Sequence, residues 1–248
     1  MHYWQYIVLF LSVILGGGLA FFVQQNYRRY LQLVLSFSGA YILAISVLHL
    51  LPTIFYDGNE RVGLWILLGF FVQLLLEMLS RGVEHGHIHA PHEARTGFAL
   101  QLMLGLCIHA FVEGMPLGYY TDIHEATFGH RHGTDHLLFG IIVHKAPAAF
   151  ALVLLMLVAR YRHPVILLCL IIFALMSPLG AAMATVLEHS QLLNPIHLRN
   201  ITAFVVGSFL HIATTILFEQ DSSGHHHISL SKLLAIGGGF GIALMTMH

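Results

Sequence analysis

Two segments of the chain place imidazole and carboxylate groups inside long apolar stretches. One reads HAFVEG over 109–114 and the other reads HKAP over 144–147. A charged side chain at the centre of a bilayer costs at least ~2.5–3.5 kcal/mol, so such residues are rare and usually functional. Imidazole nitrogens and carboxylate oxygens are common ligands of a borderline metal ion such as Zn²⁺. The sequence therefore predicts a buried metal site built from His109, Glu113 and His144.

The two motifs lie at similar depths in the helices that would carry them. Glu113 lies six residues before the end of an apolar segment over about 98–119, and His144 lies seven residues after the beginning of the next, over about 137–158. If these helices are antiparallel, a rise of ~1.5 Å per residue puts both groups roughly 10 Å below one membrane surface. His109 lies one turn before Glu113 and therefore on the same helical face.

Prolines interrupt the backbone close to these residues. Pro116 removes the N–H that would bond the carbonyl of Val112, and Pro147 does the same for Val143. Pro178 repeats the pattern in a third apolar segment. Broken backbone at membrane depth is tolerated mainly where it lines protein or a water-filled cavity. The prolines thus indicate a pathway beside the predicted site.

Composition identifies the class of protein that must hold this site. The chain has 248 residues, of which 57% are hydrophobic and 9% charged, with a net charge of −1. A soluble domain carries roughly 25% charged residues, so this composition predicts an all-α polytopic membrane protein embedded in a lipid bilayer. The near-neutral charge argues against nucleic acid as a partner. Cys107 and Cys169 each lie in an apolar run, and we interpret them as small buried residues rather than as a disulfide.

Eight segments are long and apolar enough to cross a membrane as helices of ~20 residues. They span about 5–23, 33–52, 63–80, 98–119, 137–158, 165–187, 201–218 and 230–247, and they make residues 1–248 one transmembrane domain. The first has no basic residue before it, so we interpret it as a retained helix rather than a signal peptide. Seven Lys or Arg residues fall on one side and three on the other, which favours an N-out/C-out orientation.

At these residues the sequence resembles the ZIP family of divalent-metal transporters over essentially its whole length. The motif from His109 to Gly114 matches the helix-four motif of that family, and HKAPAAF over 144–150 matches its helix-five motif. The LHLLP run over 48–52, the SPLG run over 177–180 and the histidines near residue 90 are also similar. The resemblance implies a 3+2+3 arrangement of helices with an inverted repeat. It also implies inward metal transport by alternating access, with His109, Glu113 and His144 as ligands.

Departures from the family pattern imply one metal ion rather than two. Many members have an acid four residues after the helix-five histidine, where this chain has Ala148. Members with two metals also have an acid and an asparagine where this chain has Lys145 and Ala110, and Ser177 stands at a position that is acidic in some of them. We interpret Lys145 as an ammonium group at the place of the second cation. The fourth ligand is then water, His49 or His211.

Three further interpretations concern polar residues outside the motifs. For His211 we expect a hydrogen bond that bridges two helices, and for Glu77 an ion pair with Arg81 one turn later. Histidines in the loops either gather metal loosely or are only solvated polar residues. They are His85, His87, His89 and His92 on the inner side and His130, His132 and His136 on the outer side.

Two other functions remain open at this stage. An intramembrane zinc hydrolase would also bury His and acid ligands, but Glu113 would then have to be the general base instead of a ligand. A metal-sensing receptor would bind without transporting. Among metals, the nitrogen and oxygen donors favour Zn²⁺ over Fe²⁺, Mn²⁺ and Cd²⁺. We expect a multi-pass protein of the cell (inner) membrane with no resident cofactor besides the transported metal, and a homodimer is left open.

Overall fold

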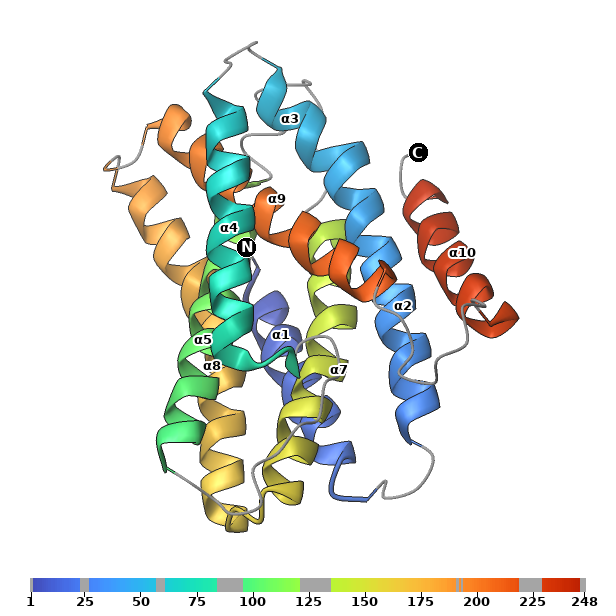
Figure 1. Ribbon diagram of the computed structural model, residues 1–248. Helices are drawn as coiled ribbons and strands as arrows, with labels where there is room; N and C mark the ends of the chain where they lie inside the picture. The colour runs from blue at the N-terminus through green and yellow to red at the C-terminus, as the bar shows by residue number, and fades with distance from the viewer. Residues whose placement is uncertain are drawn as a thin grey trace.

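The computed structural model describes residues 2–22, 27–56, 61–83, 96–120, 135–190, 192, 194–218 and 229–245, all of which are helical or connect helices (Figure 1). The helices are α1 (Tyr3–Leu19), α2 (Tyr27–Ile45), η1 (Ser46–Leu50), α3 (Leu51–Phe55), α4 (Val62–Ser80), α5 (Thr96–Gly114), η3 (Met115–Gly118), α7 (Asp135–Val158), α8 (His163–His189), α9 (Pro195–Phe218) and α10 (Leu230–Met245). All eight segments predicted from the sequence coincide with helices. Within the described residues the prediction of an all-helical chain is therefore confirmed, and its apolar helices are consistent with a polytopic membrane protein.

Six of the helical stretches are long and apolar enough to cross a membrane, while α1 and α10 are apolar but shorter. Helix α1 has 17 residues and α10 has 16, which correspond to about 24–26 Å. The predicted first span was too long at its C-terminal end, because α1 stops at Leu19 and turns at Ala20.

The predicted span over 33–52 is not one regular helix. Helix α2 ends at Ile45, and a π-helical turn leads into α3. Pro52 lies just after this turn and lacks an N–H, which removes one bond of the regular α-helical ladder. The carbonyl oxygen of His49 accepts hydrogen bonds from Thr53 Oγ1 at 2.8 Å and from the Tyr120 hydroxyl at 3.3 Å. The end of the span over 33–52 is thus hydrogen-bonded to the end of the span over 98–119, which carries part of the predicted site.

The span over 98–119 also departs from a regular α-helix near its end, again next to a proline. Helix α5 stops at Gly114, and Met115–Gly118 forms a 3₁₀ turn that contains Pro116. Helix α7 passes through Pro147 without ending. In Figure 1, α4, α5, α7 and α8 run alternately down and up the bundle, so α5 and α7 are antiparallel as expected.

Four pairs of helices approach so closely that a glycine of one faces a backbone carbonyl of the other. The contacts are Gly16 of α1 on Ala146 of α7, Gly180 of α8 on Phe111 of α5, Gly69 of α4 on Phe204 of α9, and Gly239 of α10 on Phe37 of α2. A Cβ atom at any of these glycines would lie 1.9–2.3 Å from the facing oxygen. Glycine is therefore required at all four contacts, in keeping with the use of small residues where helices pack in membranes.

Candidate metal centre

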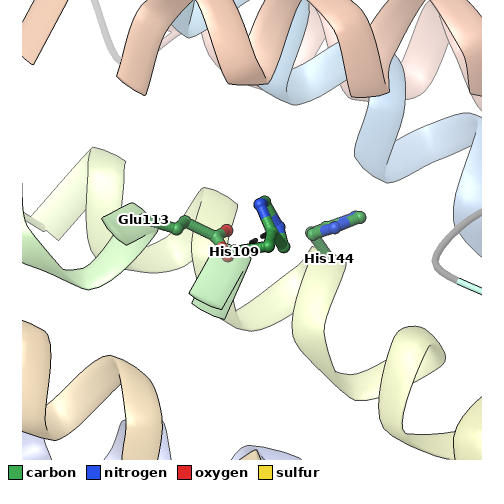
Figure 2. A group of neighbouring side chains, drawn as sticks. All are labelled: His109, Glu113 and His144. Carbon is green, nitrogen blue, oxygen red and sulfur yellow. Dashed lines mark ion pairs between the residues drawn. The ribbon is translucent and has the colours of Figure 1, made fainter. Parts of the chain in front are cut away.

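Three buried side chains from α5 and α7 meet inside the bundle (Figure 2). His109 and Glu113 come from α5 and His144 from α7, and their exposed fractions are only 2%, 1% and 1%. Their ligand atoms all lie within 4.8 Å of one another, and His109 Nε2 is 3.2 Å from Glu113 Oε2. The rings of His109 and His144 face each other edge-on with centroids 6.1 Å apart. These distances suit side chains that could close around one ion.

Helix α8 fixes the backbone of α5 beside this cluster. Gly114 packs on the backbone of Ser177, where an added Cβ would lie 2.2 Å from the Ser177 carbonyl oxygen. The Ser177 hydroxyl donates a hydrogen bond to the Ala110 carbonyl at 2.9 Å. Ala110 directly follows His109, and Gly114 directly follows Glu113. Ser177 therefore supports the helix that carries the cluster rather than pointing a donor atom into it.

Lys145 lies directly beside the carboxylate. Its Nζ is 2.8 Å from Glu113 Oε2 and 4.9 Å from the centre of the Phe173 ring, and only 1% of the side chain is exposed. Glu113 thus lies between the His109 imidazole and the Lys145 ammonium group. The formal charges of Glu113 and Lys145 cancel, which compensates two charges that would be costly if buried alone.

The other residues considered from the sequence lie elsewhere. Among the described residues, the group that could hold a metal consists of His109, Glu113 and His144, so neither His49 nor His211 joins it. The ring of His49 lies next to that of His136 at 5.9 Å between centroids, near the beginning of α7. Ala148 is buried among apolar side chains. The described part of the structure therefore offers three ligands at this centre.

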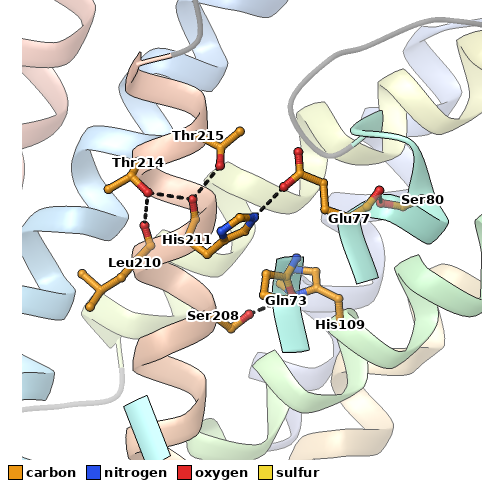
Figure 3. Close-up of polar contacts among 9 residues, drawn as sticks. All are labelled: Gln73, Glu77, Ser80, His109, Ser208, Leu210, His211, Thr214 and Thr215. Carbon is orange, nitrogen blue, oxygen red and sulfur yellow. Dashed lines mark hydrogen bonds and ion pairs between the residues drawn. The ribbon is translucent and has the colours of Figure 1, made fainter. Parts of the chain in front are cut away.

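His211 makes the helix-bridging hydrogen bond that the sequence suggested, but its partner was not anticipated. Its Nε2 lies 2.5 Å from Glu77 Oε2, across α9 and α4 (Figure 3). The sequence predicted an ion pair between Glu77 and Arg81, and this prediction is wrong because the Glu77 carboxylate pairs with His211. Arg81 adopts a left-handed conformation with φ 54° at the end of α4, and its guanidinium lies over the Phe98 ring. The Arg81 N–H still bonds the Glu77 carbonyl, but the Arg81 side chain lies over Phe98 and the Glu77 carboxylate pairs with His211 instead.

Of the seven loop histidines predicted to gather metal, only His136 lies among the described residues. His85, His87, His89, His92, His130 and His132 lie outside the described residues. His136 belongs to the first turn of α7, and its carbonyl oxygen accepts a hydrogen bond from Tyr41 at 3.2 Å. Whether these histidines gather metal therefore stays a prediction. Cys107 and Cys169 are free thiols, as expected.

Sequence reasoning missed a polar residue that reaches the cluster from another helix, and the partner that it bonds there. Ser208 of α9 lies 3.5 Å from His109 Nδ1, and its hydroxyl donates to Gln73 Oε1 of α4 at 2.9 Å (Figure 3). Both residues are buried, Gln73 at 1% and Ser208 at 5% exposure. A buried glutamine in an apolar span was the available signal, because such a group is costly in hydrocarbon without a partner.

Comparisons with known proteins relate this chain to one family of transporters. The family model of the ZIP zinc transporters matches residues 83–247. The chain is 32% identical over 177 residues to zinc transporter ZIP9 of Micropogonias undulatus, covering 67% of this chain and 54% of that protein. It is 30% identical over 180 residues to zinc transporter ZIP9-B of Xenopus laevis, covering 68% and 56%. It is 23% identical over 265 residues to zinc transporter ZIP1 of Homo sapiens, covering 88% and 78%. The matches thus span about half the length of the ZIP9 relatives.

Proposed function

The chain belongs to the ZIP family of zinc transporters, and from this we propose that it carries Zn²⁺ or a related divalent cation across a membrane. The observation that carries the proposal is the buried cluster of His109, Glu113 and His144, whose ligand atoms lie within 4.8 Å of one another. We propose these three side chains as the metal ligands. Two imidazoles and one carboxylate form a donor set found in zinc sites that keep a position open for water.

The site holds one ion. Lys145 supports this step, because its ammonium group lies 2.8 Å from the Glu113 carboxylate that a second metal would otherwise share. Ala148 has no donor atom, so water completes the coordination. A cation that keeps a water and faces a neutralised carboxylate is held less tightly than in a closed four-ligand site. Such moderate binding suits transport, which requires both entry and release.

The transport mechanism is alternating access within a 3+2+3 bundle of eight spans. The glycine contacts support an inverted repeat, because α1 on α7 corresponds to α8 on α5, and α4 on α9 corresponds to α10 on α2. Under this correspondence Phe111 matches Ala146, and each lies two residues after a histidine of the site. Metal sites at the interface of two such repeats are a recurring transporter design.

Orientation and substrate follow from charge and donor chemistry. The excess of Lys and Arg in alternate loops favours outer termini, with transport directed toward the cytoplasm across the cell membrane. Nitrogen donors from two histidines favour Zn²⁺ over Mn²⁺. Fe²⁺ and Cd²⁺ are the competitors that a selectivity assay has to include. The homologous family consists of transporters, which favours this function over the hydrolase.

Uptake of Zn²⁺ into proteoliposomes tests the proposal. The variants His109→Ala and Glu113→Ala should lose uptake while still eluting as folded protein. His197→Ala is the matched control, since this histidine lies exposed at the beginning of α9. Full uptake by both site variants would refute the proposed ligands. Stoichiometric zinc binding by the unmodified protein without any uptake would instead identify a sensor.

A further inference from the structure

Polar and glycine contacts join α4 and α9 at successive levels beside the cluster. Gly69 packs on the Phe204 carbonyl, Gln73 bonds Ser208, and Glu77 bonds His211, so contacts recur every turn along both helices. Ser208 lies in the middle level and reaches α5 at His109 (Figure 3). Because the contacts on either side fix the position of α9 along α4, the Ser208 hydroxyl is held against Gln73, and it lies 3.5 Å from His109 Nδ1.

Because Ser208 has only one hydroxyl proton, the partner that receives this proton determines how Ser208 can bond the imidazole. A serine hydroxyl has one proton to donate, and here it is donated to Gln73 Oε1 at 2.9 Å. Toward His109 Nδ1, 3.5 Å away, the Ser208 oxygen can therefore only accept. An accepting oxygen stabilises the tautomer that carries its proton on Nδ1. In that tautomer Nε2, which faces Glu113 at 3.2 Å, keeps the lone pair that a metal ion needs.

We propose that Gln73 and Ser208 are positioning residues of the metal site, acting through His109. Ser208 accepts the Nδ1 proton of His109 and holds the ring with Nε2 toward the metal, while Gln73 takes the Ser208 proton and keeps the oxygen in its accepting role. Metal-binding histidines usually donate their second N–H to such a partner, and loss of the partner typically costs 10–100-fold in affinity. The inference rests on the proposed function, because it needs His109 to be a ligand.

Zinc affinity of the full-length protein in detergent tests the role of Ser208. Ser208→Ala should weaken Zn²⁺ binding about tenfold, measured by competition with a zinc-sensitive dye. Ser38→Ala is the matched control, because Ser38 is also fully buried but its hydroxyl bonds the Leu35 carbonyl in its own helix. Its affinity should equal that of the unmodified protein. Equal affinities of the Ser208→Ala and Ser38→Ala variants would overturn the proposal.

A double-mutant cycle tests the link through Gln73. Gln73→Met removes the acceptor at similar side-chain length, so the Ser208 proton can turn toward His109 Nδ1 and favour the wrong tautomer. The variant should therefore bind Zn²⁺ about as weakly as Ser208→Ala, and the double variant should be no weaker than either. Additive losses would contradict a shared action through the Ser208 proton and would indicate two separate packing effects.

Two further measurements distinguish a failure of this inference from a failure of the proposed function. His109→Ala gives the zinc binding of the remaining histidines as a background, and retention of full affinity in this variant would refute the ligand assignment itself. Loss in His109→Ala with none in Ser208→Ala would overturn the positioning role alone. Absorption by bound Co²⁺ supplies a spectroscopic readout: its d–d bands should shift in Ser208→Ala and stay unchanged in Ser38→Ala.

Discussion

Replacement of Lys145 by methionine tests the charge balance of the proposed site. The substitution keeps a long apolar side chain next to Phe173 but removes the ammonium group 2.8 Å from Glu113. The carboxylate, 1% exposed, would then have the His109 imidazole beside it without a compensating cation. Breaking one side of a buried ion pair costs about 3–5 kcal/mol. For a chain of this size a loss of 3 kcal/mol corresponds to a decrease in melting temperature of about 6–12 °C.

Zinc should reverse this loss, because a dication bound by Glu113 supplies the missing positive charge. The part of the destabilisation that zinc relieves appears as tighter binding, and each 1.4 kcal/mol is about a tenfold change in Kd. We therefore expect Lys145→Met to melt well below the unmodified protein without metal, to recover with Zn²⁺, and to bind Zn²⁺ at least about tenfold more tightly. Tighter binding slows release, so both the KM and the maximal rate of uptake should fall.

The assay combines thermal unfolding with and without Zn²⁺ and initial rates of uptake into proteoliposomes. Lys232→Met is the control, since it removes the other lysine of the chain at the beginning of α10, far along the sequence from the cluster. An unchanged melting temperature without metal, together with an unchanged zinc Kd in Lys145→Met, would refute the reasoning that Lys145 compensates Glu113.

Three more predictions follow from the packing around the site. Gly180→Ala should destabilise the protein by about 1–3 kcal/mol, because the new Cβ would lie 2.0 Å from the Phe111 carbonyl oxygen. Gly237→Ala, which has open space within 4 Å, should not, and equal melting temperatures would count against the contact. His211→Ala should cost about 1–3 kcal/mol by removing the partner of Glu77, while the zinc KM stays the same; a raised KM would place His211 at the site. Ala148→Glu should lower both KM and maximal rate by adding a fourth donor one turn after His144, and an unchanged KM would argue against an open position there.

The helices were predictable because hydrocarbon-length apolar runs leave few alternatives in a membrane protein. The ends of the helices were harder to predict. The π-helical turn before Pro52 and the 3₁₀ turn at Pro116 depend on which oxygen or N–H finds a partner, and these partners come from other parts of the chain. Glu77 shows the same limit, since the residue that pairs with its carboxylate, His211, comes from another helix.

The three central side chains could be chosen from sequence because their motifs put them at equal depth on neighbouring helices. Ser208 and its partner Gln73 could not, because the contact of Ser208 with His109 depends on how α4 and α9 pack against α5. Periodicity within one helix carries no information about that arrangement. The role of Ser177 was missed for the same reason: its hydroxyl bonds the backbone of α5, so the residue type did not reveal its direction.

In the proposed inverted repeat, neither charged residue of the proposed site corresponds to another charged residue. If Phe111 of α5 corresponds to Ala146 of α7, then His109 corresponds to His144, Glu113 to Ala148, and Ala110 to Lys145. The two histidines thus occupy equivalent positions, while the acid and the lysine each correspond to an alanine in the other half of the repeat. A symmetric site with two acids could balance two dications. Here one acid is paired with Lys145 at 2.8 Å, so a second dication would meet an ammonium group instead of a carboxylate. The loss of symmetry at these two positions is therefore the physical reason to expect a single ion.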